Sequence, residues 1–201
     1  MPDSSTLTPL YWILAAAVGA ACIVLGLALQ HFFIEPVRPE PRVRLFQDAS
    51  VLLALSHAGA VLYLGPPTVA NGLAGIALFT LGTTIFLAVI EVSRRTPMPR
   101  AFLPVLPDRL ITTGPFRFVR HPVYIAYTAF WLGAPAATGK WWLLPVGIGS
   151  VVLYVIAARQ EEARWLASSR AAEYRDYMTR TGRFFPRLRR PRSQSGPRTV
   201  D

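Results

Sequence analysis

Two polar clusters stand out in a chain that is otherwise dominated by apolar runs. The first is the string Arg120-His121-Pro122-Val123-Tyr124, and the second, further along, is the pair Glu161-Glu162. A guanidinium group offers a planar pair of donors to a carboxylate or phosphate, and an imidazole can take or give a proton near neutral pH. The two carboxylates can face a cation, either an arginine of the protein or a cationic ligand. Together these groups could orient a charged ligand and move a proton.

Both clusters border apolar segments, where a charged side chain is costly unless it is paired or hydrated. A basic, aromatic collar that anchors a helix end at the membrane surface would also explain the first cluster. A structural ion pair that ties two helices together would explain the second. Spacing alone leaves these alternatives open, but the whole string together with the acidic pair favours a functional site.

The composition is typical of an integral membrane protein. The chain has 201 residues, of which 52% are hydrophobic and only 16% charged, whereas soluble domains contain about 25% charged residues. The net charge of +10 could indicate a nucleic-acid ligand. However, the arginines lie between and after the apolar runs, as in cytoplasmic membrane flanks. We therefore expect membrane lipid rather than nucleic acid as a partner. Cys22 is the only cysteine, and no metal site is expected.

The apolar runs predict an all-α protein with about five transmembrane helices, since a spanning helix needs about 20 residues. The second and fourth runs are the shortest. We expect the fifth run to continue beyond the membrane as a polar helix to about Met178, closing over the polar clusters. The five predicted spans are 10–32, 49–64, 69–90, 124–137 and 141–157.

The distribution of arginines predicts the orientation of these spans. Arginines are concentrated in the loops after the first, third and fifth runs, and these loops are therefore expected to be cytosolic. The N-terminus is then outside and the C-terminus cytosolic. The fourth and fifth runs would form an antiparallel hairpin, which brings Arg120 and Glu162 to the same cytosolic end.

The polar strings resemble one family of membrane enzymes. Gly114 to Tyr124, Glu161-Glu162, Glu173 to Tyr177 and Arg183-Phe184-Phe185-Pro186 resemble the isoprenylcysteine carboxyl methyltransferase and phospholipid methyltransferase superfamily. The resemblance covers residues 110–186, and it implies a region that wraps S-adenosylmethionine at the cytosolic face while the methyl acceptor approaches from the lipid. Residues 1–109 then form the acceptor side, with a proline-rich loop at their end, and residues 187–201 a basic, disordered tail.

Carried over position by position, the resemblance assigns cofactor contacts around both polar clusters. Phe116 stands where the family often has tyrosine, so a hydroxyl contact is missing there. The implied cofactor-binding residues are Leu110, Ile111, Phe116, His121, Pro122, Val123, Tyr124, Glu161 and Glu162.

Three residues are expected to act on the acceptor: Arg120, Arg159 and His121. The carboxyl methyltransferases have a substrate-binding arginine just before the acidic pair, but strict alignment places Ala158 there and Arg159 one residue later. Because a helix turns about 100° per residue, Arg159 would point elsewhere unless the register differs. His121 is the nearby candidate base if the acceptor is a thiol or an amine.

The leading hypothesis is therefore an S-adenosylmethionine-dependent membrane methyltransferase, with a prenylcysteine-type carboxylate as the favoured acceptor. A lipid amine or a small thiol is the alternative acceptor. A membrane sterol-reductase-like enzyme that uses NADPH shares part of the pattern, but this chain has Val123 where such enzymes usually have asparagine. A non-enzymatic scaffold whose arginines bind anionic lipid is the third hypothesis.

Overall fold

A computed structural model describes residues 4–31, 33–34, 41–94, 96, 98–99, 106–107 and 109–187. Over these residues the regular structure is helical, apart from one pair of two-residue parallel strands that joins the segments after the first and third helices and a single parallel bridge between Val119 and Gly182. The predicted tail beyond Arg187 lies outside the described residues. The elements are α1 (Ser4–His31), β1 (Phe33–Ile34), α2 (Pro41–Leu64), α3 (Val69–Ser93), β2 (Met98–Pro99), η1 (Gly114–Arg117), α4 (Pro122–Thr138), η2 (Trp141–Leu143), α5 (Leu144–Leu166) and α6 (Ala171–Arg180).

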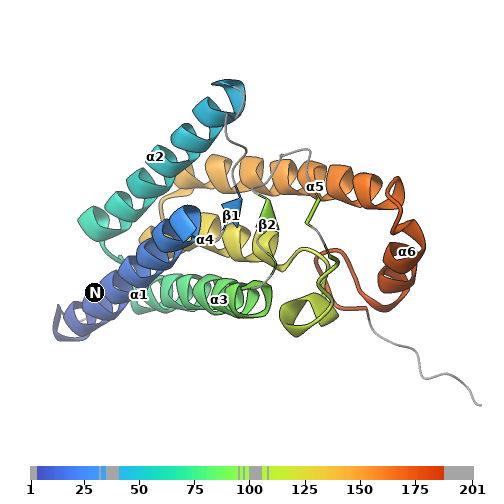
Figure 1. The fold of residues 1–201 in the computed structure, drawn as a ribbon. Helices are drawn as coiled ribbons and strands as arrows, with labels where there is room; N and C mark the ends of the chain where they lie inside the picture. The colour runs from blue at the N-terminus through green and yellow to red at the C-terminus, as the bar shows by residue number, and fades with distance from the viewer. Residues whose placement is uncertain are drawn as a thin grey trace, which may run out of the picture.

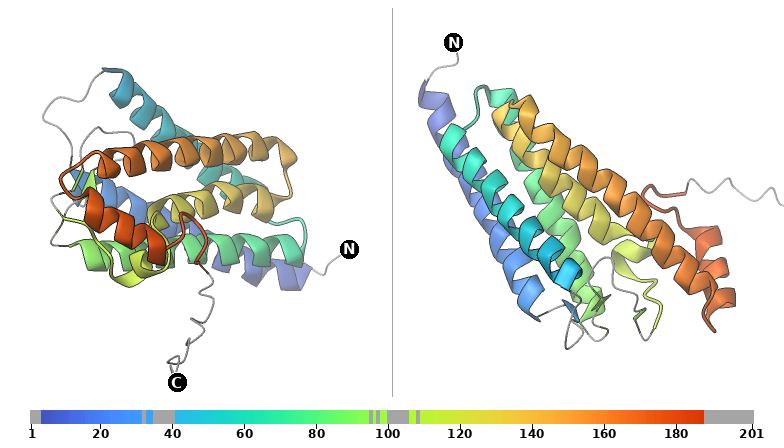
Figure 2. Two further views of the ribbon diagram at one scale, coloured as in Figure 1. Left: turned by 90° about the vertical axis from the view of Figure 1, so that its right-hand side faces the viewer. Right: turned by 90° about the horizontal axis from the view of Figure 1, so that it is seen from above.

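The five long helices pack alongside one another, and the short helix α6 lies at one end (Figures 1 and 2). α3 packs against α1 on one side and α4 on the other, and α4 also contacts α2 and α5. Gly139, with a φ of 66°, ends α4 and allows the tight turn into η2 and α5. The predicted α4–α5 hairpin is thus present.

Within the part of the chain that the structure describes, three helical segments are long and apolar enough to cross a membrane: Leu7–Ala28, Val69–Ser93 and Trp141–Leu166. The all-α prediction is confirmed, and a helix exists at each of the five predicted spans. α4 has 17 residues, fewer than the roughly 20 that a span needs. α2 begins at Pro41, earlier than the predicted start of the second span, so it includes charged residues such as Arg44 and Asp48. The count of five spans stays a prediction.

The predicted continuous helix to Met178 is wrong, because α5 ends at Leu166 and α6 begins at Ala171. The Ser168 hydroxyl donates a 2.7 Å hydrogen bond to the Trp165 carbonyl in the turn between them. This turn folds α6 back so that the Tyr174 ring stacks on Trp165, with ring centroids 5.5 Å apart and planes 8° from parallel. Both rings are buried in this arrangement, and the burial of aromatic surface favours the break.

Glycines let α3 and α4 approach closely. A Cβ on Gly75 would lie 2.5 Å from the Cβ of Ala137, and one on Gly133 would lie 2.8 Å from the Phe79 ring. Small residues at a helix interface allow this backbone proximity in membrane proteins, where packing rather than water exclusion drives association. The close packing continues toward the start of α4, where a Cβ on Gly82 would lie 3.0 Å from the Ala126 carbonyl oxygen.

We expect Gly75→Ala to destabilise the protein by about 1–3 kcal/mol, because the methyl group meets backbone and Cβ atoms of Ala137 that cannot move independently. The measurement is the thermal unfolding midpoint in detergent. Gly149→Ala on α5 is the control, since a Cβ there has no atom within 4 Å and alanine favours the helix. Equal midpoints for the two variants would contradict the close approach.

Candidate active site

The string that opens α4 is held by backbone hydrogen bonds to residues 181–187, which we call the C-terminal strap. The Arg120 N–H donates to the Gly182 carbonyl at 2.8 Å, and the His121 N–H donates to the Arg183 carbonyl at 3.2 Å. Pro122 lies in the first turn of α4, where a helix does not need its N–H. These main-chain contacts place the side chains of Arg120 and His121 beside α5.

The carboxylate of Glu162 is the centre of a buried ion cluster. Its Oε1 accepts from Arg120 Nε at 2.9 Å, His121 Nε2 at 3.2 Å and Arg183 Nε at 3.1 Å, and its Oε2 accepts from Arg183 Nη2. The Glu162 side chain is only 5% exposed and that of Arg120 only 6%. A buried charge is stable only when nearly all of its hydrogen-bonding positions are paired. Three side chains on two segments, Arg120, His121 and Arg183, pair the Glu162 carboxylate.

Arg120 and Arg183 are held by this cluster rather than free for a ligand. Arg120 Nη1 donates a second hydrogen bond to the Thr181 carbonyl at 2.5 Å, which ties it to the C-terminal strap. Hydrogen bonding to Glu162 raises the pKa of the Arg183 guanidinium, so that group stays charged. The cluster therefore joins the start of α4, the end of α5 and the C-terminal strap.

Glu161 is more loosely held than Glu162. Its side chain is 27% exposed, and its Oε2 lies 3.7 Å from His121 Nδ1 and 3.5 Å from the Tyr124 hydroxyl, which donates to it. Both distances are at or beyond the long end of hydrogen-bond geometry. The Glu161 carboxylate can therefore still accept hydrogen bonds from a cationic group or a hydroxyl group of a ligand.

An aromatic stack leads from the ion cluster along α4 and α5. The His121 ring stacks on Tyr124, with centroids 5.5 Å apart, and Tyr124 stacks on Tyr154 at 5.3 Å. The hydroxyl of Tyr154 accepts a 2.8 Å hydrogen bond from the Trp131 indole. Stacking fixes the plane of His121, and with it the direction in which Nδ1 faces.

α6 supports the opposite side of the string. The Tyr177 hydroxyl donates a 2.7 Å hydrogen bond to the Phe116 carbonyl. Burial raises the pKa of both the Tyr174 and the Tyr177 phenols, so Tyr177 keeps the proton that this contact needs. Phe116 is itself buried, and its ring packs with Val123 and Ile111 in the core around α3.

The structure brings together several of the residues that the sequence predicts to bind the cofactor or the acceptor. His121, Tyr124, Glu161, Glu162 and Arg120 form one connected group. Pro122 and Val123 are buried at the start of α4. Leu110 and Ile111 belong to hydrophobic clusters beside the site, Leu110 with Trp165 and Tyr174.

Arg159 does not join this group in the described contacts. It is exposed on α5, whereas Ala158 is fully buried. This agrees with the expectation that an arginine one residue out of register points elsewhere.

The sequence reasoning missed Arg183 as a partner of Glu162. Arg183 belongs to the string Arg183-Phe184-Phe185-Pro186, which is part of the family resemblance, but the sequence did not predict its ion pair with Glu162. One signal was available: a buried carboxylate has about four acceptor positions, which a single arginine cannot fill. Tyr154 was also missed, because one tyrosine in an apolar run carries no signal of its own.

The fold and the site define a helical membrane protein with a charged cluster at the mouth of a helical hairpin. A profile of the phospholipid methyltransferase family matches residues 70–173. The chain therefore belongs to the phospholipid methyltransferase family, which is part of the isoprenylcysteine carboxyl methyltransferase-like superfamily of membrane methyltransferases.

Two curated proteins are similar to the chain. A cobalt-zinc-cadmium resistance protein of Cupriavidus metallidurans is 29% identical over 133 residues, which are 66% of this chain and 56% of the relative. A nickel-cobalt-cadmium resistance protein of Alcaligenes xylosoxydans xylosoxydans is 30% identical over 125 residues, 62% of this chain and 52% of the relative. The matches thus span little more than half the length of either relative. Among the described residues, no group of three His, Cys, Asp or Glu side chains is placed to hold a metal ion.

We expect Glu162→Gln to lower the free energy of unfolding by about 3 kcal/mol, because it leaves the buried Arg120 and the half-buried Arg183 without an anion. Glu161→Gln is the matched control on the neighbouring, more exposed residue, and it should change stability by less than about 1 kcal/mol. Chemical or thermal unfolding in detergent measures both. Similar losses for the two variants would show that the cluster does not depend on Glu162.

Proposed function

We propose that the protein is an S-adenosylmethionine-dependent methyltransferase that methylates a lipophilic or small acceptor at the cytosolic face of a membrane. The observation that carries the proposal is the partly exposed Glu161 carboxylate beside His121 and Tyr124, held in place by the saturated Glu162 cluster. The family membership supports the reaction class.

The residues around Glu161 suit the proposed cofactor. S-adenosylmethionine carries a sulfonium, an ammonium group and ribose hydroxyls, and a carboxylate with spare acceptor capacity suits such groups. Glu161, Tyr124 and His121 would hold the polar parts, and Leu110 and Ile111 would contact apolar parts as the resemblance implies. When bound, the cofactor supplies a methyl group on a positively charged sulfur. Positioning and exclusion of water would then provide most of the rate.

His121 is placed to accept a proton from the methyl acceptor. A carboxylate only accepts hydrogen bonds, so the ring nitrogen Nε2 that faces Glu162 carries the hydrogen. Nδ1 then remains as the acceptor and lies 3.7 Å from Glu161 Oε2. A proton taken up at Nδ1 would lie between the His121 ring and the Glu161 carboxylate. An amine or thiol acceptor needs this step, and a carboxylate acceptor does not.

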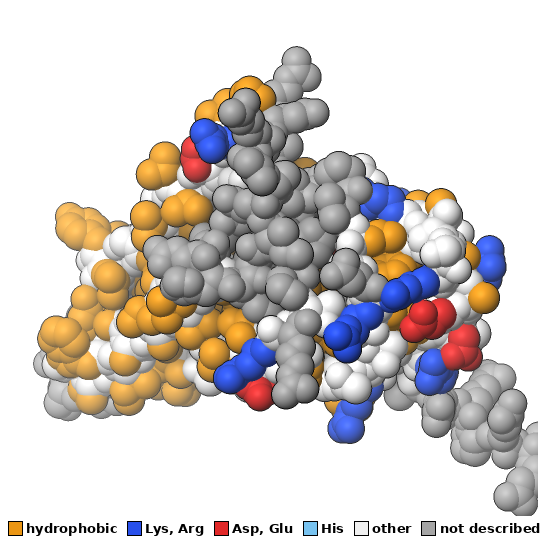
Figure 3. All heavy atoms as spheres, viewed as in Figure 1, with side chains coloured by type: hydrophobic (Ala, Val, Ile, Leu, Met, Phe, Trp, Pro, Cys, Tyr) orange, Lys and Arg blue, Asp and Glu red, His pale blue; other side chains and the backbone are white. Residues whose placement is uncertain are grey.

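The exposed surface supports the proposed membrane orientation. Apolar side chains dominate the left-hand part of the face in Figure 3, over the long helices, and arginines gather toward the end that carries α6. Exposed apolar residues such as Trp12, Leu73 and Ile148 suit contact with lipid. With the arginine-bearing end cytosolic, the N-terminus is outside and the site faces soluble cofactor.

We expect S-adenosylmethionine at 100 times its dissociation constant to stabilise the purified protein by about 2.7 kcal/mol. Glu161→Gln should weaken this binding about tenfold, since a charge-assisted contact is lost. Isothermal titration or ligand-dependent thermal unfolding measures the affinity. Glu91→Gln is the control, because Glu91 forms an exposed pair with Arg94 on α3. Stabilisation by NADPH instead, or unchanged cofactor affinity in Glu161→Gln, would contradict the proposal.

Arg159 provides a test of the acceptor class. Arg120 and Arg183 are engaged with Glu162, and the resemblance assigns an acceptor carboxylate to an arginine at or next to Arg159, which is exposed outside the connected group. If Arg159 has that role, Arg159→Ala should lower kcat/KM for a prenylcysteine-type acceptor at least tenfold while sparing lipid-amine and thiol acceptors. Transfer of a labelled methyl group to the three acceptors measures this, with exposed Gln160→Ala as the control. Equal activity of both variants on the carboxylate would exclude that role for Arg159.

A further inference from the structure

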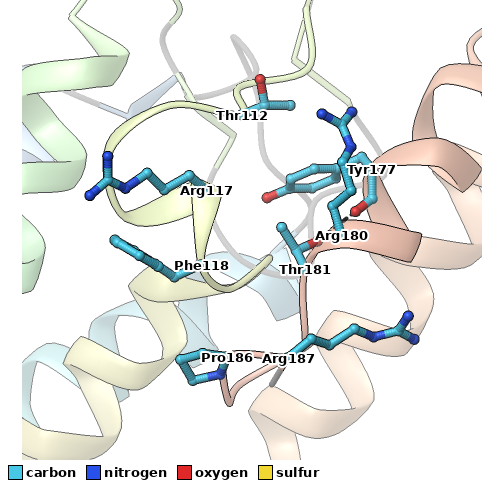
Figure 4. Close-up of a pocket in the computed structure, with 8 residues that line it drawn as sticks. All are labelled: Thr112, Arg117, Phe118, Tyr177, Arg180, Thr181, Pro186 and Arg187. Atoms are coloured by element: carbon cyan, nitrogen blue, oxygen red, sulfur yellow. Dashed lines mark hydrogen bonds between the residues drawn. The ribbon is translucent and has the colours of Figure 1, made fainter. Parts of the chain in front are cut away.

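A pocket of about 430 Å³ opens beside the proposed methyl-transfer site and is not used by it. Figure 4 shows that it lies between η1, the end of α6 and the C-terminal strap. Arg117 and Phe118 line it from one segment, Tyr177 and Arg180 from α6, and Arg187 from the strap. Thr181 also lines it, and the Thr181 carbonyl accepts from the buried Arg120. The pocket therefore adjoins the ion cluster.

The lining is strongly basic. Among the described residues, the lining contains three arginines and no acidic side chain. Arg180 pairs with Asp176, but both side chains are more than half exposed, so this ion pair is weak and exchangeable. Arg187 donates one hydrogen bond to the Thr179 carbonyl, and the Arg117 guanidinium lies 4.4 Å from the centre of the Phe118 ring. Each guanidinium has five N–H donors, so donors remain on all three.

Two neutral hydroxyl groups of the pocket are already used within the protein. The Tyr177 hydroxyl donates to the Phe116 carbonyl, and the Thr181 hydroxyl donates to the Tyr177 carbonyl. A ligand would thus be recognised mainly by the arginines, which stand at different sides of the opening in Figure 4. Guanidinium groups match the oxygens of a phosphate with pairs of parallel hydrogen bonds.

Exposed aromatic side chains adjoin the same pocket. Phe118 is 49% exposed, and Phe185, next to the lining residue Pro186, is 82% exposed. Aromatic and basic residues occur together where a protein meets the headgroup layer of a bilayer. Arg187, where the described chain ends, also lines the pocket.

We propose that this pocket binds a phosphate group, carried by an anionic membrane lipid or by a soluble phosphate. The pocket is separate from the proposed cofactor contacts at Glu161 and Tyr124. It would hold a phosphate next to the segments that form the ion cluster, without taking part in methyl transfer.

The test compares the double variant Arg117→Gln/Arg180→Gln with Arg175→Gln. Arg175 is an exposed arginine of α6 outside the pocket lining, so this control shows the effect of one surface charge. The purified full chain in detergent is titrated with short-chain phosphatidic acid, inorganic phosphate and S-adenosylmethionine. Thermal unfolding is measured at each concentration, and the midpoints without ligand report whether each variant folds.

We expect the wild type to bind phosphatidic acid about tenfold more tightly than the double variant does, and Arg175→Gln to bind like the wild type. The same pattern with inorganic phosphate would support a soluble source, and binding of the lipid alone would support the membrane. No binding of either, or equal losses in both variants, would overturn the proposal. Weaker binding of S-adenosylmethionine in the double variant would also overturn it, because the pocket would then hold the cofactor's carboxylate. Failure of the methyltransferase proposal would leave the phosphate result unaffected.

Discussion

The pairing of the Glu162 carboxylate is the interaction on which the rest of the site depends. A carboxylate that is 5% exposed would be strongly destabilising by itself, because burial removes its hydration. Arg120 and His121 satisfy it from the start of α4, and Arg183 satisfies it from the C-terminal strap. One side chain on α5 therefore links two other segments that are distant in the sequence. The backbone hydrogen bonds between residues 120–121 and 182–183 fix the same arrangement independently.

The two glutamates of the acidic pair have different surroundings although they are adjacent. A helix turns about 100° between neighbouring residues, so Glu162 faces the packed side and Glu161 faces the opening. The result is one carboxylate that is saturated by the protein and one that keeps capacity for a ligand. The aromatic stack of His121, Tyr124 and Tyr154 supplies the wall beside the second carboxylate. This division of roles is the basis of the proposed methyl-transfer site.

The helices beneath the site provide a rigid base. Close contact at Gly75 and Gly133 holds α3 and α4 together, and α1 packs on the other side of α3. The break between α5 and α6 lets Tyr177 reach the Phe116 carbonyl, which braces η1 from the side opposite α5. The same fold-back sets α6 and the C-terminal strap around the arginine-lined pocket. The ion cluster around Glu162 and the arginine-lined pocket are thus supported by the same helices.

The apolar runs by themselves determined the helical class, the presence of a helix at each predicted span and the hairpin of α4 and α5, because long apolar segments in a membrane must satisfy their backbone groups internally. The strings around His121 and Glu162 also identified the superfamily and most of the connected site. Only the tertiary structure decided which polar groups meet. It made Arg183 a partner of Glu162, left Arg159 exposed, and ended α5 at Leu166 so that Tyr174 can stack on Trp165. These outcomes depend on helix rotation and on contacts between distant segments, which local pattern and spacing do not specify.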